Sequence, residues 1–97
     1  MASPPSYPKR DIRRMLIVLA AIAELRPHAT LVRIAMRTGL DRHTVTGLVD
    51  QARAQVGVTN SKVGTVYRIV SWGQVIRPSG ARLALNPPSR SESRKPS

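Results

Sequence analysis

Side chains able to perform chemistry are few in this chain of 97 residues, and they follow no catalytic pattern. The chain has two histidines, five acidic residues and no cysteine. His28 follows a proline in an expected loop and has no second ligand at metal-binding spacing. The acids form no Glu-x-x-His motif, and no glycine-rich phosphate loop is present. The sequence therefore predicts a protein that is not an enzyme, with no catalytic residues, no metal site, no cofactor and no small-molecule ligand.

Basic residues dominate the charge of the chain. Sixteen Lys and Arg stand against five Asp and Glu, which gives a formal net charge of +11. Most of these cations are Arg, whose planar guanidinium suits phosphates and guanine edges. A GC-rich genome alone would raise the Arg content, but it would not explain the scarcity of acids. The charge balance favours a polyanionic partner, which can be DNA, RNA or an anionic membrane surface.

A membrane-spanning segment is not expected. The longest apolar run, residues 15–23, is far shorter than the roughly 20 residues that cross a bilayer. It follows a polar, proline-containing start that lacks a signal-peptide cleavage site. We therefore expect a cytoplasmic protein that does not enter a membrane.

Composition divides the chain into three parts. Residues 1–8 are rich in proline and serine and are expected to form a disordered arm. Residues 77–97 are expected to form a basic, largely disordered tail, within which residues 81–85 can dock briefly. Residues 9–76 form the single expected domain.

Apolar periodicity predicts three helices in the expected domain. The first covers residues 9–25 and is ended by Pro27. Its apolar residues surround much of the helix. This indicates either that other elements of the domain cover the helix or that it pairs with a second copy of the chain. A homodimer is therefore a possible partner. The second helix covers residues 31–38 after Thr30 as N-cap, and the third runs from Arg42 to about Gln55.

The second and third helices carry the residues that a helix-turn-helix needs. Ala35 is small enough to let the next helix cross closely, and Gly39 tolerates the left-handed turn four positions later. Leu40 is the apolar residue after the turn, and Val45 and Leu48 are placed to be buried in the helix that follows. Asp41 is a good N-cap for that helix.

A β-hairpin is expected after the third helix, because the pattern changes from helical to alternating. Residues 56–58 and 66–70 are the predicted strands, and residues 60–65 are the predicted connection, with Lys62 at its tip. Residues 72–76 are expected to close the domain, with Trp72 covering its edge. The expected fold class is mainly α with a small β-hairpin (α+β): a three-helix helix-turn-helix core followed by a wing.

The segment LVRIAMRTGLDRHTVTGLVDQA resembles the helix-turn-helix of bacterial and phage regulators. Its part LDRHTVTGLVDQA is especially similar to the recognition region of MarR-type winged-helix regulators, and VGVTNSKVGTVYRIVSWG resembles the wing of small winged-helix domains such as that of biotin-operon repressors. The resemblance covers roughly residues 10–76. The chain departs from MarR-type proteins in lacking their dimerisation helices, and in having Gly47 where they commonly have a basic residue.

This resemblance implies that the third helix lies in the major groove of double-stranded DNA with its N-terminal residues at the base edges. Arg42 would pair with guanine, with His43 beside it, and Thr46 would touch a thymine methyl or a phosphate, next to Gly47. The helix N-terminus, with Thr44, would favour a phosphate.

Further contacts are expected around this helix. Lys62 would contact the minor groove or backbone from the wing, and Arg33, Arg37 and Arg53 would contact phosphates. The Lys9–Arg10 and Arg13–Arg14 pairs can extend the footprint. Each of these residues can instead be an ordinary solvated surface residue.

Three functions are compatible with these features. The first is sequence-specific DNA binding by a small transcriptional regulator, a repressor or accessory factor of a size typical of phages and plasmids. The second is a protein-interaction module built on a winged-helix scaffold. The third is a basic protein that coats nucleic acid non-specifically.

Overall fold

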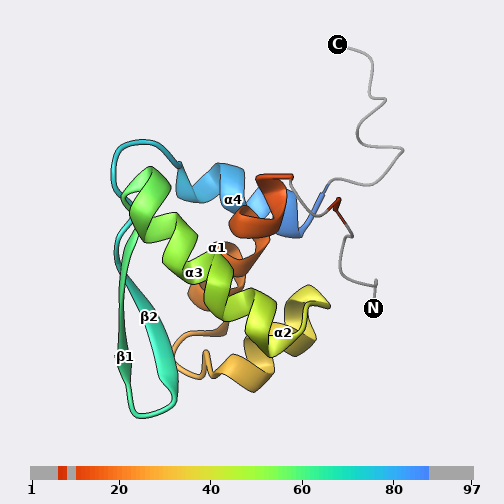
Figure 1. Cartoon of the computed structure of the whole chain (residues 1–97), viewed down its shortest axis with the longest axis vertical. Coiled ribbons are helices and arrows are strands. Elements are labelled where there is room, and N and C mark those ends of the chain that lie inside the picture. The colour runs from red at the N-terminus through yellow and green to blue at the C-terminus, as the bar shows by residue number, and fades with distance from the viewer. Residues whose placement is uncertain (1–6, 9–10, 88–97) are drawn as a thin grey trace.

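The fold, taken from a computed structural model, is described for residues 7–8 and 11–87. In chain order these residues form α1 (Arg13–Leu25), α2 (Leu31–Thr38), α3 (Arg42–Val56), β1 (Thr59–Val63), β2 (Val66–Ser71) and α4 (Pro78–Leu85). Figure 1 shows α3 lying across the front of the molecule, with the hairpin at one side and α2 at the opposite end of α3. The expected class, mainly α with a small β-hairpin, is confirmed.

The middle of α1 is the centre of the hydrophobic core. All six residues from Ile17 to Ile22 are at most 1% exposed. Six consecutive helical positions point in every direction around the helix axis, so this segment is enclosed on all sides. α2, α3, α4 and β2 all pack against it. The first of the two expectations for this helix therefore holds: other elements of the same domain surround α1. The helix leaves no broad apolar face for a second copy.

The helix ends follow local hydrogen bonds that the sequence anticipates. The Thr30 side chain accepts a hydrogen bond from the Arg33 amide at the start of α2, as expected of its N-cap. α3 continues to Val56, one residue beyond the expected end, and Gly57 caps it in the left-handed region. α1 begins at Arg13, whose amide donates a hydrogen bond to the Asp11 carboxylate at 2.8 Å, and the first expected helical residues, Lys9 and Arg10, lie outside the described residues.

The first strand of the hairpin differs from the sequence-based prediction. Val56 belongs to α3, and β1 consists of residues 59–63, most of which were expected to be loop. Polar residues are tolerated there because β1 pairs with β2 on one side only and its other edge faces solvent. The connection is the two-residue turn Gly64–Thr65, in which only Gly64 has positive φ, the pattern of a type II′ turn.

The turn end of the hairpin is attached to the connection between α1 and α2. The Tyr67 amide donates a hydrogen bond to the Ala29 carbonyl at 2.8 Å, and Thr30 forms an antiparallel bridge with Val66. The Tyr67 side chain is buried, and Trp72 packs against both hydrophobic clusters of the core. The hairpin is thus fixed to the same core as the helices, and Trp72 closes it as the sequence predicts.

The expected domain boundary at residue 76 is too early. Pro78–Leu85 is a helix, and its residues Ala81, Ala84 and Leu85 are buried against α1. The physical reason is that α1 would expose one of its apolar sides to water without α4. The expected disordered arm also needs correction at Tyr7, whose hydroxyl donates to the Ala84 carbonyl at 2.6 Å.

The remaining parts of the expected arm and tail lie outside the described residues. This holds for residues 1–6 and 88–97, and also for Lys9 and Arg10. In the part of the chain that the structure describes, every helix is too short or too polar to cross a membrane.

The burial of α4 gives a first prediction. Leu85 is 2% exposed, whereas Leu83 on the same helix is 59% exposed. We expect Leu85→Ala to lower the free energy of unfolding by about 2–5 kcal/mol, because it leaves a cavity against α1. The control Leu83→Ala should change it by less than about 0.5 kcal/mol. Urea unfolding followed by circular dichroism measures both, and equal effects would show that α4 is not part of the core.

Candidate nucleic-acid interface

The turn between α2 and α3 fixes how the two helices cross. Gly39 has φ of 75°, and its amide donates a hydrogen bond to the Ala35 carbonyl at 2.9 Å. The buried Thr38 hydroxyl donates to the Ile34 carbonyl at 2.8 Å, and Leu40 packs against the core. Val45, the first buried residue of α3, is fully enclosed. α3 is consequently held by its apolar face, and its opposite face is turned to solvent.

Asp41 occupies the N-terminus of α3. Its carboxylate accepts hydrogen bonds from the Thr44 amide at 3.1 Å and from the Thr44 hydroxyl at 2.6 Å. These bonds hold the pKa of the Asp41 carboxyl below its ordinary value, and the bond from the Thr44 hydroxyl has the largest effect. A phosphate at the Thr44 donors, as expected from the sequence, would have to compete with the Asp41 carboxylate that they already bind.

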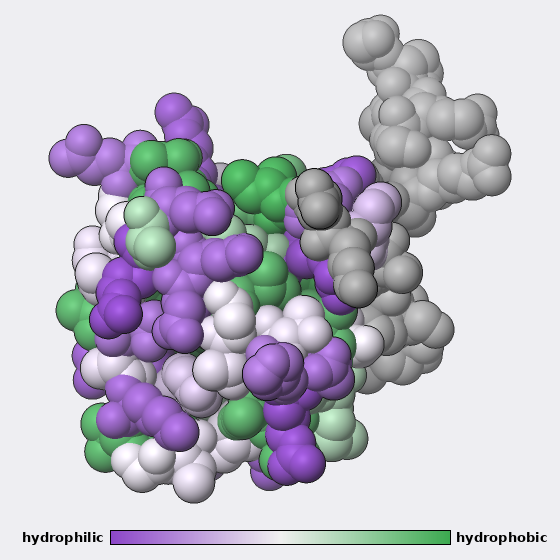
Figure 2. Space-filling view, in the orientation of Figure 1, coloured by the Kyte–Doolittle hydropathy of each residue, from purple (hydrophilic) through white to green (hydrophobic). Residues whose placement is uncertain are grey.

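The solvent face of α3 presents most of the residues expected at base edges. Arg42 and His43 in the first turn are exposed, as are Thr46 and Gly47 in the second. The Thr46 hydroxyl donates to the Arg42 carbonyl at 3.0 Å. Figure 2 shows hydrophilic residues toward both ends of α3 and residues of intermediate hydropathy over its middle.

The two expected phosphate contacts on α2 lie in different surroundings. Arg33 is exposed. The Arg37 guanidinium instead donates to the Glu24 carboxylate of α1 at 2.6 Å and to the Asn86 side chain after α4 at 2.6 Å. The hydrogen bond from Arg37 lowers the pKa of the Glu24 carboxyl. Arg37 therefore links α1, α2 and the segment after α4, and the phosphate contact expected of it would have to compete with these bonds.

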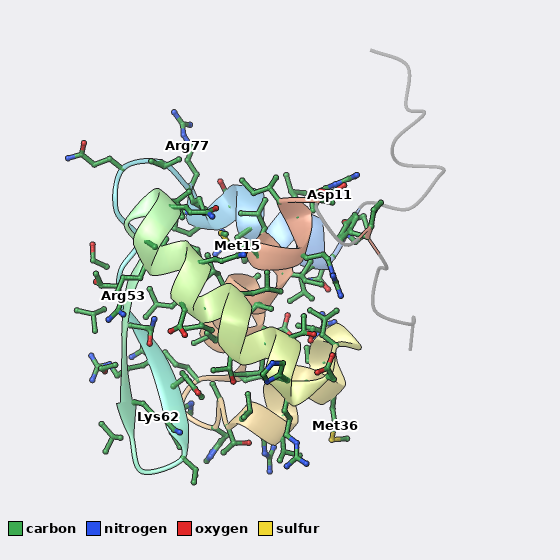
Figure 3. The ribbon with its side chains drawn as sticks, viewed as in Figure 1. Asp11, Met15, Met36, Arg53, Lys62 and Arg77 are labelled. Atoms are coloured by element: carbon green, nitrogen blue, oxygen red, sulfur yellow. The ribbon has the colours of Figure 1, made fainter. Side chains whose placement is uncertain are left out.

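Arg53 and Lys62 extend the basic surface from α3 to the hairpin. Figure 3 shows Arg53 on the side of α3 nearest the hairpin and Lys62 on the hairpin itself. Lys62 lies within β1, not in the turn, and its Nζ is 5.3 Å from the centre of the Tyr67 ring. This cation–π contact holds the Lys62 ammonium on the face of the hairpin that Tyr67 occupies.

Arg68 is a basic residue that sequence reasoning did not select. It pairs with Ser61 across the hairpin and is exposed. Because side chains alternate along a strand, Arg68 lies on the face opposite Tyr67 and Lys62. The alternation of Tyr67, Arg68 and Ile69 is the signal in the sequence that places it there.

Among residues 7–8 and 11–87, no group of three or more His, Asp or Glu side chains is arranged to hold a metal ion. His28, in the connection between α1 and α2, is exposed.

Comparison with known proteins adds no functional information, since no family model, curated protein or solved structure matches this chain.

The N-cap of α3 gives a second prediction, on pH dependence. The lowered pKa of Asp41 means that its stabilising contribution is present above the ordinary Asp value of 3.8 and is lost as the pH falls through the lowered value. Asp41→Ala should lower the free energy of unfolding at neutral pH, and its difference from the unmodified protein should shrink in acid.

Asp41→Asn is the matched variant, because an asparagine keeps the hydrogen-bond acceptor and removes the titrating group. We expect it to stay close to the unmodified protein at neutral pH. Denaturant unfolding of the three proteins over a range of pH measures these differences. A pH-independent effect of Asp41→Ala would contradict the role assigned to the Asp41 carboxylate.

Proposed function

We propose that this protein binds double-stranded DNA sequence-specifically and acts as a small transcriptional regulator with a winged helix-turn-helix domain. The observation that supports this most is the presentation of α3. Its apolar face is locked against α1 and α2, while Arg42, His43 and Thr46 are exposed on the other side. Residues in a fixed array on a helix can be matched to base edges in a way that flexible basic tails cannot.

The dimensions of α3 suit a major groove. A helix of 15 residues is about 22 Å long, and the major groove, about 12 Å wide, admits one α-helix. The first turn of α3 would enter the groove, so that Arg42 can donate two hydrogen bonds to guanine N7 and O6, with His43 next to it. Arg33 lies on α2, before the first turn of α3 in the chain. It would contact a phosphate at the edge of the major groove.

The described charges leave the basic residues available for phosphates. Asp11 pairs with Arg13, which lowers the pKa of Asp11 to about 2, and Glu24 pairs with Arg37. Among the described residues, no carboxylate forms an ion pair with Arg33, Arg42 or Arg53. Asp41 is used as an N-cap. Asp11, Glu24 and Asp41 are thus engaged in holding the fold, and of the described acids Asp50 alone is left exposed without an ion pair or cap, which supports an electrostatic contribution from the basic surface.

The hairpin would supply the contacts beside the groove. Lys62 is aligned by Tyr67, and Arg68 projects from the opposite face of the same ladder. The attachment of Tyr67 to Ala29 fixes the hairpin relative to α2, so the spacing between wing and α3 would be constant. We assign Lys62 and Arg53 to the DNA backbone, since Lys62 lies on the hairpin and Arg53 near the C-terminal end of α3, away from the first turn that would enter the groove.

Selection from random duplexes tests this function and gives the third prediction. We expect one enriched motif, and Arg42→Ala should weaken binding to it by about 5- to 150-fold, the value of a bidentate contact to guanine. The matched control is Arg82→Ala, which removes the same charge from an exposed position on α4. The control should have a much smaller effect. Absence of an enriched motif together with unchanged binding by Arg42→Ala would refute sequence-specific binding.

The same measurements separate the other two functions. A non-specific coating protein should lose binding equally in Arg42→Ala and Arg82→Ala, and should lose most of it when residues 1–6 and 88–97 are removed. A protein-interaction module should show no duplex affinity and a stable hetero-complex by sedimentation. Sedimentation with and without DNA also tests the homodimer expected from the sequence, for which α1 offers no broad apolar face; a dimer would give a palindromic motif.

Two arginines of α2 give the fourth prediction, as a matched pair. Arg33→Ala should flatten the dependence of log K on log salt by about 0.9, the effect of one lost phosphate contact, without changing stability. Arg37→Ala should lower the free energy of unfolding by about 0.5–1 kcal/mol, because it breaks a partly exposed ion pair that solvent screens, and should leave the salt slope unchanged. The reverse pattern would overturn these two assignments.

A further inference from the structure

Gly47 lies at the centre of the exposed face of α3, where a glycine is unfavourable. Glycine destabilises the interior of a helix relative to alanine. No atom of the protein outside the local helix backbone and the neighbouring residues lies within 4 Å of the position that a Cβ would occupy at Gly47. No close contact inside the protein accounts for the glycine, so we look for its reason in a partner that approaches the helix backbone.

Thr46 presents a methyl group beside this glycine. Its side chain is exposed, but its hydroxyl is turned back along the helix and donates to the Arg42 carbonyl at 3.0 Å. The hydroxyl proton is thus used within the helix, and the γ-methyl is the part of the side chain left for a partner. Thr46 and Gly47 together form a low, apolar spot on an otherwise polar helix face.

The charges around this spot favour a base edge over a phosphate. Asp50 is exposed on the same helix, four residues after Thr46 and three after Gly47, which places it on the same face. Its carboxylate would repel a phosphate at this spot. Arg42, one turn before Thr46, and Arg53, nearly two turns after it, lie nearer the ends of the face, where phosphates can be accommodated.

We propose that Thr46 and Gly47 bind the C5-methyl group of a thymine in the major groove. The Thr46 methyl would pack against the thymine methyl, a contact typical of thymine recognition, and the missing side chain at Gly47 would let the helix backbone come close enough to make it. The chosen base pair is then A·T, and the contact is apolar. This inference rests on the proposed duplex binding and specifies one position of the recognised sequence.

Uracil substitution tests the contact, because it removes only the methyl group of thymine. In the selected duplex, replacing each thymine by uracil in turn should identify one position where affinity falls by about fourfold, the value of one buried methyl group. In Thr46→Ser, which keeps the hydroxyl and loses the methyl, that same replacement should change affinity less than about twofold. The coupling between the two changes measures the contact itself.

Gly47→Ala tests the close approach, and its control is Gly80→Ala, a second helical glycine with no atom within 4 Å of its added Cβ. We expect both variants to fold and Gly47→Ala to unfold at higher denaturant. Gly47→Ala should weaken binding of the selected duplex at least about fivefold, as steric exclusion from the groove requires, while Gly80→Ala should not change it.

The outcomes distinguish this inference from the function on which it rests. If no duplex sequence is selected, both fail. If a sequence is selected but no thymine responds to uracil, or if Thr46→Ser responds as strongly as the unmodified protein, the thymine contact is wrong and duplex binding stands. Unchanged or tighter binding by Gly47→Ala would likewise overturn the close approach alone.

Discussion

The enclosure of α1 is the constraint on which the rest of the structure depends. A helix with six consecutive residues almost without solvent contact needs partners on every side, and one layer cannot supply them. α2 and α3 cover part of its surface, β2 covers another, and α4 covers what remains. The orientation of α3 follows from this requirement, since its apolar residues must face α1 and its polar residues are then left outside.

The acidic and basic side chains differ in whether the fold gives them partners. Acidic side chains are few, and those at Asp11, Glu24 and Asp41 form ion pairs or a helix cap. Their negative charge is balanced locally by hydrogen-bond donors, which lowers their pKa values. The basic residues of α3 and the hairpin have no such partners among the described carboxylates. On α3 and the hairpin, the exposed cations Arg42, Arg53, Lys62 and Arg68 outnumber Asp50, the exposed acid of α3, and this balance suits a polyanion.

Arg33 and Arg37 illustrate where prediction of the site from sequence ends. They are four residues apart on one helix, and spacing alone makes them equivalent. In the fold they differ, because Glu24 is 13 residues from Arg37 in sequence and Asn86 is 49 residues away, yet both hydrogen-bond to it. The exposure of Arg42, His43, Thr46 and Arg53 was predictable from the period of α3, whereas the attachment of Arg37 to α1 and the segment after α4 was not.

The sequence by itself determined the features that depend on neighbours a few residues away. Thr30 and Asp41 cap helices through bonds to residues three positions on, and Gly39 ends α2 through its own backbone freedom. Tertiary structure alone decided the helix at Pro78–Leu85, the polar strand β1 and the bond from Tyr7 to Ala84, residues that lie 77 positions apart. These segments have weak local patterns, and they are ordered because they cover apolar surface or complete a hydrogen-bond ladder that distant residues create.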